Sequence, residues 1–322
     1  CRDDSHNHQV FDSVRGVHIR MRTDTTGAET TSSESLKSFD SDGFTLGTEQ
    51  NVNASASNDN SFVAWNWKAG TSFSNDASAT SIGSIDSTGS VSTTAGFSII
   101  SYTGNGTGGA TIAHGLGVTP NVLIIKNRDD DSQAHWAVYH DKSFVSAADP
   151  NILYLQNDAA VADDTNIRHS TATTNSTVFS VGDYNGVNGS SDNIIAYCFA
   201  EIKGYSKFGT YTGNGNADGE FVYTGFKPAW FMTKRTTSSG YNWLVYDSKR
   251  QVSFNVIDDF LFPDISDVET TGNANQSLDF VSNGIKHRGN GASSNGNGVK
   301  YIYMAFAENP FVTSTGIPVV AR

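Results

Sequence analysis

The chain has 322 residues, enough for two or three domains that each bury a core of their own. Charged residues make up 17% of it, below the roughly 25% of a typical soluble protein. The net charge of −12 disfavours nucleic acid and anionic membrane surfaces as partners, because it repels phosphate groups. No apolar run reaches the ~20 residues that span a bilayer, so no membrane insertion is expected.

Residues 1–69 match only the second half of a sequence repeat that occurs in full further along the chain. CRDDSHNHQVFDSVRG at 1–16 aligns with the segment at 127–142, and VAWNWKA at 63–69 aligns with IAYCFAE at 195–201. Nothing in 1–69 matches 97–126, so we expect an incomplete first β-sandwich with open strand edges and an uncovered core. Cys1, with no initiator Met before it, suggests a processed or partial chain.

Residues 70–96 separate this partial repeat from the first complete one. They are rich in Ser, Thr and Gly and show no aliphatic alternation, which predicts a linker. The second repeat, 97–203, contains short runs of β-branched and aromatic residues between Gly, Asn, Asp and Pro clusters. Strands are expected at 97–102, 122–125, 136–139, 152–155, 178–181 and 194–199.

The third repeat, 206–311, follows the second in the order and spacing of its segments. SYTGNG at 101–106 recurs as TYTGNG at 210–215, and GVTPNVLIIKNR at 117–128 recurs as GFKPAWFMTKRT at 225–236. WAVYHDK at 136–142 recurs as WLVYDSK at 243–249. No helical periodicity is sustained anywhere, so the sequence predicts an all-β protein of tandem antiparallel β-sandwich repeats, jelly-roll-like, with the first repeat incomplete. Residues 312–322 remain as a C-terminal tail.

Acidic clusters and histidines are the candidates for metal or catalytic sites. The acidic clusters are Asp40-Ser41-Asp42-Gly43, Asp129-Asp130-Asp131, Asp163-Asp164 and Asp258-Asp259. The first resembles the opening of a calcium loop but lacks the remaining ligands, so a turn is favoured; the others are expected to be loop tips, and no metal site is predicted. The eight histidines are His6, His8, His18, His114, His135, His140, His169 and His287.

No catalytic motif accompanies these histidines. A nucleophile elbow, an HExxH helix and a phosphate loop are all missing from the sequence. The third repeat also has Asn242 at the position of His135 and Tyr223 at that of His114. We therefore predict no enzyme activity, no catalytic residues and no cofactor.

Cysteines and aromatic residues are best explained by packing. Cys198 corresponds to Ala305 and Asn66 in the other repeats, which favours a small buried side chain over a reactive thiol. Trp136, Trp243, Tyr139, Tyr246 and Phe11 recur at matching places, as core residues would. The functional alternative is that aromatic residues stack on sugars, and the loop residues Tyr184 and Tyr241 are the candidates for this role.

Several strings resemble an uncharacterised repeat family. They are FDSVRG at 11–16, SFDSDGFTLG at 38–47, VAWNWKAG at 63–70, TAGFSIISYTGNG at 94–106, HGLGVTPNVLIIKNR at 114–128 and MAFAENPF at 304–311. The family occurs in predicted virion proteins of marine bacteriophages, described as tail-fibre-like or structural. The resemblance implies a particle component and supplies no active-site residues, so the binding residues stay unknown.

The function expected from the sequence is that of a non-enzymatic phage virion structural protein, a fibre, appendage or decoration displayed outward. It would be located on the virion, outside the cell, and would form a homo-oligomer or assemble with other virion proteins, with a host-surface glycan as a further partner. One alternative is a carbohydrate-binding, lectin-like module. Another is a subunit of an extracellular filament that does not belong to a phage.

The incomplete first repeat leads to a specific expectation about assembly. Open strand edges attract further strands, so either upstream residues or a strand from another subunit would complete the first sandwich. Within the C-terminal tail, Ile317, Val319 and Val320 are apolar, which makes the tail a candidate donor strand. Pro318 argues against a central position for that strand.

Overall fold

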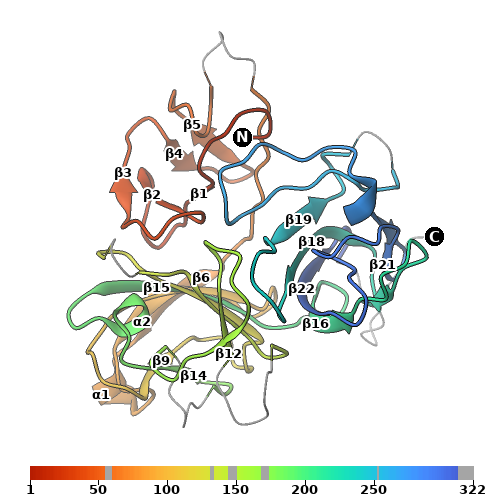
Figure 1. Ribbon diagram of the computed structural model, residues 1–322. Helices are drawn as coiled ribbons and strands as arrows, with labels where there is room; N and C mark the ends of the chain where they lie inside the picture. The colour runs from red at the N-terminus through yellow and green to blue at the C-terminus, as the bar shows by residue number, and fades with distance from the viewer. Residues whose placement is uncertain (55–59, 131–133, 144–150, 168–173, 252–253, 311–322) are drawn as a thin grey trace.

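The computed structural model describes residues 1–54, 60–130, 134–143, 151–167, 174–251 and 254–310. It is nearly all β-structure, as the sequence predicts, with short antiparallel strands and two helices of only four residues. Three lobes surround a common centre, and each repeat contributes one lobe (Figure 1). Asp131, His169 and the candidate donor strand within 312–322 lie outside the described residues.

The second repeat contains a large antiparallel sheet with β15 at its centre. Its own strands follow the order β13-β12-β11-β10-β15-β8, and β9 pairs with β14 in a second layer. All six expected strands are present. The elements are β8 (Phe97–Thr103), β9 (Ala110–Ala113), β10 (Val122–Asn127), β11 (Ala137–His140), β12 (Asn151–Tyr154), β13 (Ala162–Asp163), β14 (Val178–Val181), α2 (Asn185–Asn188) and β15 (Asn193–Phe199). Ile112 and Phe179 of the second layer share one buried core with Ile100 and Ala196 of the large sheet, which makes a sandwich.

The third repeat has the same topology. Its strand order β19-β18-β22-β16 reproduces β11-β10-β15-β8, and β17-β21-β20 form the second layer. The elements are β16 (Ser206–Thr212), β17 (Phe221–Tyr223), β18 (Pro228–Arg235), β19 (Leu244–Asp247), the 3-10 helix η1 (Ala274–Gln276), β20 (Leu278–Val281), β21 (Gly284–His287) and β22 (Lys300–Ala307). The sequence match between the two repeats is therefore also a match of fold.

The segment 70–96 is not a linker, contrary to the sequence-based expectation. It forms β6 (Thr71–Asn75), α1 (Ala77–Thr80) and β7 (Ser87–Ser92), and β7 pairs with β8 to extend the large sheet. The outer positions of this hairpin are exposed, so Ser and Thr satisfy the strand without aliphatic alternation. Gly89 is required by close packing, because a Cβ there would lie 1.9 Å from the carbonyl oxygen of Ile99.

In its described residues, 1–54 and 60–69, the first repeat contains only the later strands of the fold. They are β1 (Gln9–Val10), β2 (Ile19–Arg22), β3 (Thr30–Thr31), β4 (Leu36–Phe39) and β5 (Phe44–Leu46). Its closing segment, 63–69, corresponds to β15 but is not assigned as a strand. No backbone hydrogen bond joins 63–69 to another described residue, so both edges of this segment are open, as expected.

The expected uncovered core is absent from this segment, for a reason visible in its sequence. Trp65, Trp67 and Ala69 pack against the central core, whereas the alternate positions face solvent. Two of those exposed positions hold Asn66 and Lys68, where the second repeat has the fully buried Cys198 and Ala200. The exposed face of this segment is therefore largely polar.

The three repeats close into a ring with pseudo-threefold symmetry. Equivalent backbone hydrogen bonds join each repeat to the next, and the last repeat to the first: Glu29 N donates to Arg128 O at 2.9 Å, Val161 N to Thr236 O at 3.0 Å, and Glu269 N to Arg2 O at 2.8 Å. Arg2, Arg128 and Thr236 occupy matching positions in the aligned segments. The shorter first repeat thus makes the same contacts in the ring as the other two.

Three matching aromatic residues meet at the centre of this ring. Trp67, Phe199 and Phe306 come from the closing segments of the three repeats. Their ring centroids are 6.4 Å apart for Trp67 and Phe199, 5.4 Å for Trp67 and Phe306, and 6.1 Å for Phe199 and Phe306, all edge to face. Each such pair adds about 0.5–1.5 kcal/mol beyond its buried area. One apolar core therefore holds all three repeats together.

Candidate functional site

The two recurring tryptophans lie at the boundaries between repeats. Trp136 and Trp243 are 1% and 2% exposed, as predicted, and occupy the same place in their repeats. Trp136 Nε1 donates to the carbonyl oxygen of Arg22 at 2.8 Å, and Trp243 Nε1 donates to that of Tyr154 at 2.9 Å. Each tryptophan thus contacts the preceding repeat. His8 stands at the matching position of the first repeat, and its burial lowers its pKa.

The other recurring aromatic residues are buried to different degrees. Tyr246 is fully buried, as core packing predicts, and its hydroxyl donates to Gln276 O at 2.8 Å. Tyr139 and Phe11 are only partly buried, so these two residues lie at the edge of the core and not within it as expected. Cys198 is buried as predicted, and this burial raises the pKa of its thiol to about 12. A neutral thiol with so high a pKa is a packing residue.

A buried Asp–Arg pair occurs at the same position in the first and third repeats. Arg15 donates from Nε to Asp12 at 2.5 Å, and Arg250 donates from Nε to Asp247 at 2.6 Å. The second Asp oxygen of each pair accepts the backbone N–H of its own arginine. The signal for this pair is visible in the match of VFDSVR with VYDSKR, although sequence analysis assigned it no role.

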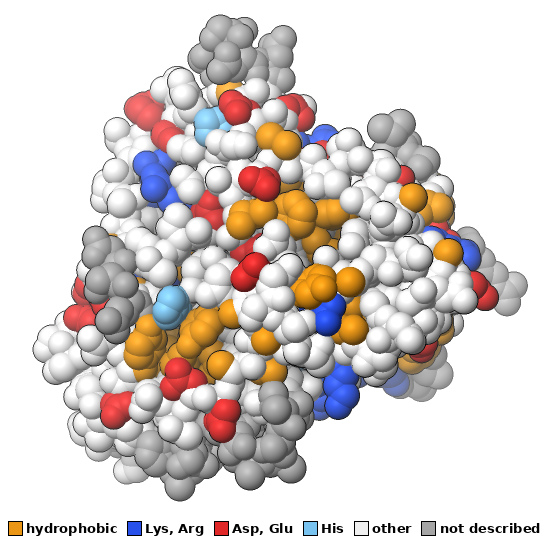
Figure 2. Space-filling model, in the orientation of Figure 1, with side chains coloured by type: hydrophobic (Ala, Val, Ile, Leu, Met, Phe, Trp, Pro, Cys, Tyr) orange, Lys and Arg blue, Asp and Glu red, His pale blue; other side chains and the backbone are white. Residues whose placement is uncertain are grey.

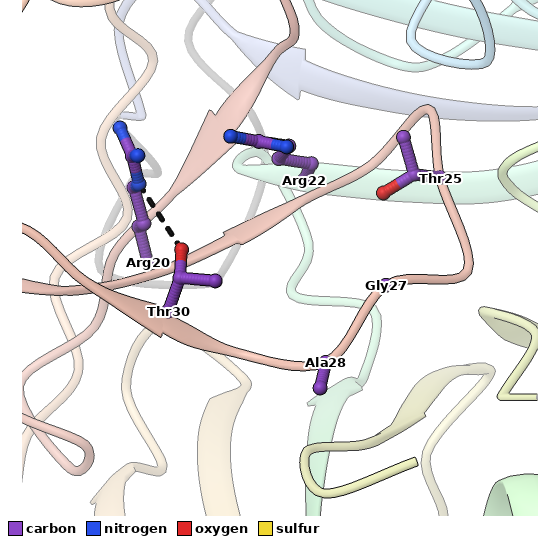
Figure 3. A pocket seen from close by; sticks show the side chains of 6 residues that line it. All are labelled: Arg20, Arg22, Thr25, Gly27, Ala28 and Thr30. Carbon is purple, nitrogen blue, oxygen red and sulfur yellow. Dashed lines mark hydrogen bonds between the residues drawn. The ribbon is translucent and has the colours of Figure 1, made fainter. Parts of the chain in front are cut away.

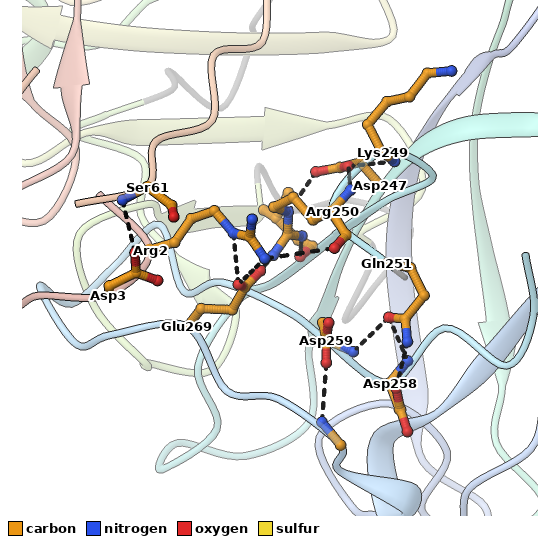
Figure 4. A network of polar contacts seen from close by, with 12 residues as sticks. Arg2, Asp3, Ser61, Asp247, Lys249, Arg250, Gln251, Asp258, Asp259 and Glu269 are labelled. Atoms are coloured by element: carbon orange, nitrogen blue, oxygen red, sulfur yellow. Dashed lines mark hydrogen bonds and ion pairs between the residues drawn. The ribbon is translucent and has the colours of Figure 1, made fainter. Parts of the chain in front are cut away.

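Both aspartates also receive a hydrogen bond from another repeat. The hydroxyl of Tyr197 donates to Asp12 at 2.7 Å, and Trp65 Nε1 donates to Asp247 at 3.0 Å. Burial tends to raise the pKa of Asp247, but the charge and hydrogen bonds of Arg250 leave that pKa lowered. Figure 4 shows how Arg250 and Arg2 converge on Glu269 to link the first and third repeats.

Histidines serve similar structural roles. In the second repeat, His140 replaces the aspartate, and its Nε2 lies 3.1 Å from the carbonyl oxygen of Tyr303 in the third repeat. His114 Nε2 lies 3.0 Å from Asn175 O, and each of these two rings accepts a backbone N–H at Nδ1. Burial lowers the pKa of both, and because Nδ1 of each ring accepts a hydrogen bond, the ring proton lies on Nε2.

The acidic clusters lie in turns and loops, as expected, with one exception: Asp163 belongs to β13, where it pairs with Asn151. Asp40 accepts from the hydroxyls of Ser38 and Thr45 at 2.8 and 2.9 Å, within the β4–β5 turn. Asp129, Asp164 and Asp259 accept backbone N–H groups, and Asp258 accepts from the Gln251 amide. Within the described part of the chain, no three His, Cys, Asp or Glu side chains are grouped as metal ligands. No described helix is long and apolar enough to cross a membrane.

The best candidate for ligand contact is a cluster of three partly exposed rings on the second repeat, His135, Tyr154 and Tyr184, hereafter the aromatic cluster. The His135 centroid is 4.6 Å from that of Tyr154 and 6.3 Å from that of Tyr184, to which it is nearly parallel. Gln156 contacts His135 Nδ1, and the Tyr154 hydroxyl lies 3.5 Å from an Asp164 oxygen. Figure 2 shows hydrophobic side chains beside a histidine over the area that the second repeat forms in Figure 1.

The aromatic cluster is polar at its rim and uncharged in its rings. Burial, then the neighbouring Asp164 and Tyr184, raise the pKa of Tyr154 to about 12. Burial and Lys126 lower the pKa of His135. Such rings offer flat faces and hydrogen-bonding edges, the combination that sugars use. The other sugar-stacking candidate, Tyr241, lies on the third repeat. The Arg235 guanidinium covers its ring, with Cζ of Arg235 3.9 Å from the Tyr241 ring centroid.

The matching place on the first repeat is a pocket of about 220 Å³. Arg20, Arg22, Thr25, Gly27, Ala28 and Thr30 line it, from β2, β3 and the loop between them (Figure 3). Arg22 corresponds to Tyr154, because the carbonyl oxygens of both accept the equivalent tryptophan hydrogen bonds. The first repeat thus has a cationic pocket at the place where the second repeat has the aromatic cluster. The sequence did not predict this pocket.

Fold and site together define a single-chain ring of two β-sandwich repeats and one incomplete repeat. Residues 1–310 belong to the family described as a domain of unknown function, DUF7483. Neither the curated proteins nor the solved structures include a significant match to the chain.

Proposed function

We propose that the chain is a non-enzymatic structural protein of a bacteriophage particle, displayed outward as a fibre, appendage or decoration and contacting the host surface. The observation that carries this proposal is the closed ring, in which one aromatic centre ties three repeats into a rigid block. A rigid, repetitive unit with a low fraction of charged residues suits a particle exposed to the medium. The resemblance of several segments to virion proteins of marine phages supports the same assignment.

The contacts of the titratable side chains also fit a structural role. His140, Asp12 and Asp247 each lie at a boundary between repeats, where they bind a group from another repeat. His114 and Cys198 are buried within the second repeat. These groups stabilise the ring itself, and this use supports the non-enzymatic part of the proposal.

Location on the particle tests the proposal. Particles of the phage that encodes the chain would be purified on a density gradient and analysed by mass spectrometry, then labelled with antibodies against the chain for electron microscopy. We expect the chain to sediment with the capsid and to be labelled on intact particles. A chain found only in the soluble lysate would contradict the proposal. A chain found in an extracellular filament without capsid proteins would instead support the filament alternative.

The second candidate function, glycan binding, is favoured by the aromatic cluster alone. A glycan array would test it with the wild-type chain, with Tyr184→Ala and with Tyr223→Ala as a matched control. Tyr223 is 63% exposed and lies on β17, in another repeat. We expect Tyr184→Ala to abolish glycan signals that Tyr223→Ala retains. Signals that survive both substitutions would exclude the aromatic cluster as their source.

A further inference from the structure

The pocket on the first repeat contains a cation, Arg22, that has no counter-charge among the described residues. Arg20 forms an ion pair with Glu49 at 2.8 Å and donates to the Thr30 hydroxyl at 3.2 Å. Arg22, two residues along β2, lies on the same face of the strand. Its guanidinium makes no ion pair or hydrogen bond with any residue that the structure describes, and its Nε is buried without a partner. The pocket therefore has one positive charge in excess, in a chain whose net charge is −12.

Neutral donors complete the lining of this pocket. Thr25 and Thr30 contribute hydroxyl groups, and the amides of Gly27 and Ala28 donate to no backbone carbonyl among the described residues. The volume of about 220 Å³ corresponds to about seven water molecules at roughly 30 Å³ each, which exceeds the space of one carboxylate. An anionic group attached to a sugar-sized body would fill it.

Comparison of the first and second repeats shows that the structural role of the Arg22 position depends on its backbone and not on its side chain. The carbonyl oxygens of Arg22 and Tyr154 make the same inter-repeat hydrogen bond, so the fold fixes the backbone at this position. The side chains differ completely, and Glu49 likewise stands where the second repeat has Tyr184, two residues after the matching Gly47 and Gly182. Packing does not dictate these side chains, which leaves them available for a ligand.

We propose that this pocket binds the carboxylate of an acidic saccharide, a hexuronate unit, through the Arg22 guanidinium. The planar fork of arginine matches two carboxylate oxygens, and the threonine hydroxyls lie where sugar hydroxyls can pair. The inference rests on the proposed contact with a host surface and names the class of glycan. It is independent of the aromatic cluster, which is uncharged.

Titration calorimetry tests this inference with a galacturonate tetramer, a neutral galactose tetramer and inorganic sulfate. We expect the wild-type chain to bind the galacturonate tetramer and not the neutral one. Arg22→Gln should weaken binding by at least about tenfold, since a charge-assisted hydrogen bond is lost, and Arg22→Lys should weaken it less. Lys37→Gln is the matched control, because it removes an equal charge from an exposed pair on the same repeat and should leave binding unchanged.

Four calorimetric results would overturn the inference: no binding of the galacturonate tetramer, equal binding by Arg22→Gln, equal binding of the neutral tetramer, or binding of sulfate that the galacturonate tetramer does not displace. If near-ultraviolet circular dichroism shows that Arg22→Gln is unfolded, amide chemical shifts of the wild-type chain decide instead. Shifts confined to Thr25–Thr30 on adding the galacturonate tetramer support the site, and shifts elsewhere overturn it. A chain located on particles that binds no galacturonate would refute this inference alone, whereas absence from particles would refute the proposed function.

Discussion

Trp136 donates a hydrogen bond from Nε1 to the carbonyl oxygen of Arg22, 114 residues earlier in the chain, at 2.8 Å. Trp243 repeats this contact with Tyr154 at 2.9 Å. These two bonds show that a residue expected to fill the core of its own repeat also fixes the position of the repeat before it. Among the residues that the structure describes, the boundaries between repeats therefore contain the two largest fully buried side chains.

Trp136→Phe should reduce the free energy of unfolding by about 1–3 kcal/mol. The substitution removes the indole N–H, leaves the Arg22 carbonyl without this donor, and keeps an aromatic ring in place. Urea unfolding followed by circular dichroism would measure the change. Tyr223→Phe, at an exposed position, is the control and should stay within about 0.5 kcal/mol of the wild type. A loss equal to that of the control would show that the hydrogen bond does not stabilise the ring.

Stability should fall in acid because of His287. Burial, then the charge of Lys286, lower the pKa of His287 to about 3, and neither ring nitrogen has a hydrogen-bond partner in the described structure. The unfolded chain has the ordinary histidine pKa of about 6.5. Between these values the unfolded state binds a proton that the folded state does not, so the free energy of unfolding rises with pH up to about 6.5 and then levels off.

His287→Gln would isolate this contribution. The group should contribute about 2 kcal/mol less to stability at pH 5 than at pH 8, at about 1.4 kcal/mol per pKa unit. Urea unfolding at the two pH values would therefore show a smaller difference for His287→Gln than for the wild type. An unchanged difference would mean that His287 is protonated in the folded protein.

Amide hydrogen exchange should distinguish the closing segments of the repeats. The amides of β15 and β22 pair with strands on both sides, whereas 63–69 has no backbone hydrogen bond to another described residue. We expect 63–69 to exchange orders of magnitude faster than 194–199, although Trp65 and Trp67 are held in the core. Slow exchange of 63–69 would indicate that strands have been added to its edges, the completion predicted from the sequence.

The sequence predicts the fold within each repeat better than the arrangement of the repeats. The runs at 97–102, 122–125 and 194–199 became β8, β10 and β15, since apolar β-branched residues leave few alternatives. The β6–β7 hairpin was missed because its exposed face allows Ser and Thr, which are equally typical of linkers. The ring depends on contacts between residues more than a hundred positions apart, and local periodicity carries no information about them.

For the candidate site, too, the sequence predicts single residues better than the contacts between them. Recurrence of Trp136 and Trp243 predicted their burial, but not the carbonyl groups they bind. Tyr184, the candidate for stacking on sugars, is partly exposed, and its contact with His135 depends on how the segment before β11 packs against the start of α2. The sequence could not predict that Arg22 has no partner among the described residues, because this depends on which side chains the fold brings near it.

A double-mutant cycle between Trp67 and Phe306 tests the central claim, closure of the ring between the first and third repeats, most directly. Their rings lie 5.4 Å apart at the centre, although they are remote in sequence. Unfolding free energies of Trp67→Leu, Phe306→Leu and the double variant should give a coupling of at least about 0.5 kcal/mol. A control cycle of Trp67 with Phe280, which belongs to the separate core of the third repeat, should be additive. Additivity of Trp67 and Phe306 within about 0.3 kcal/mol would contradict the closed ring.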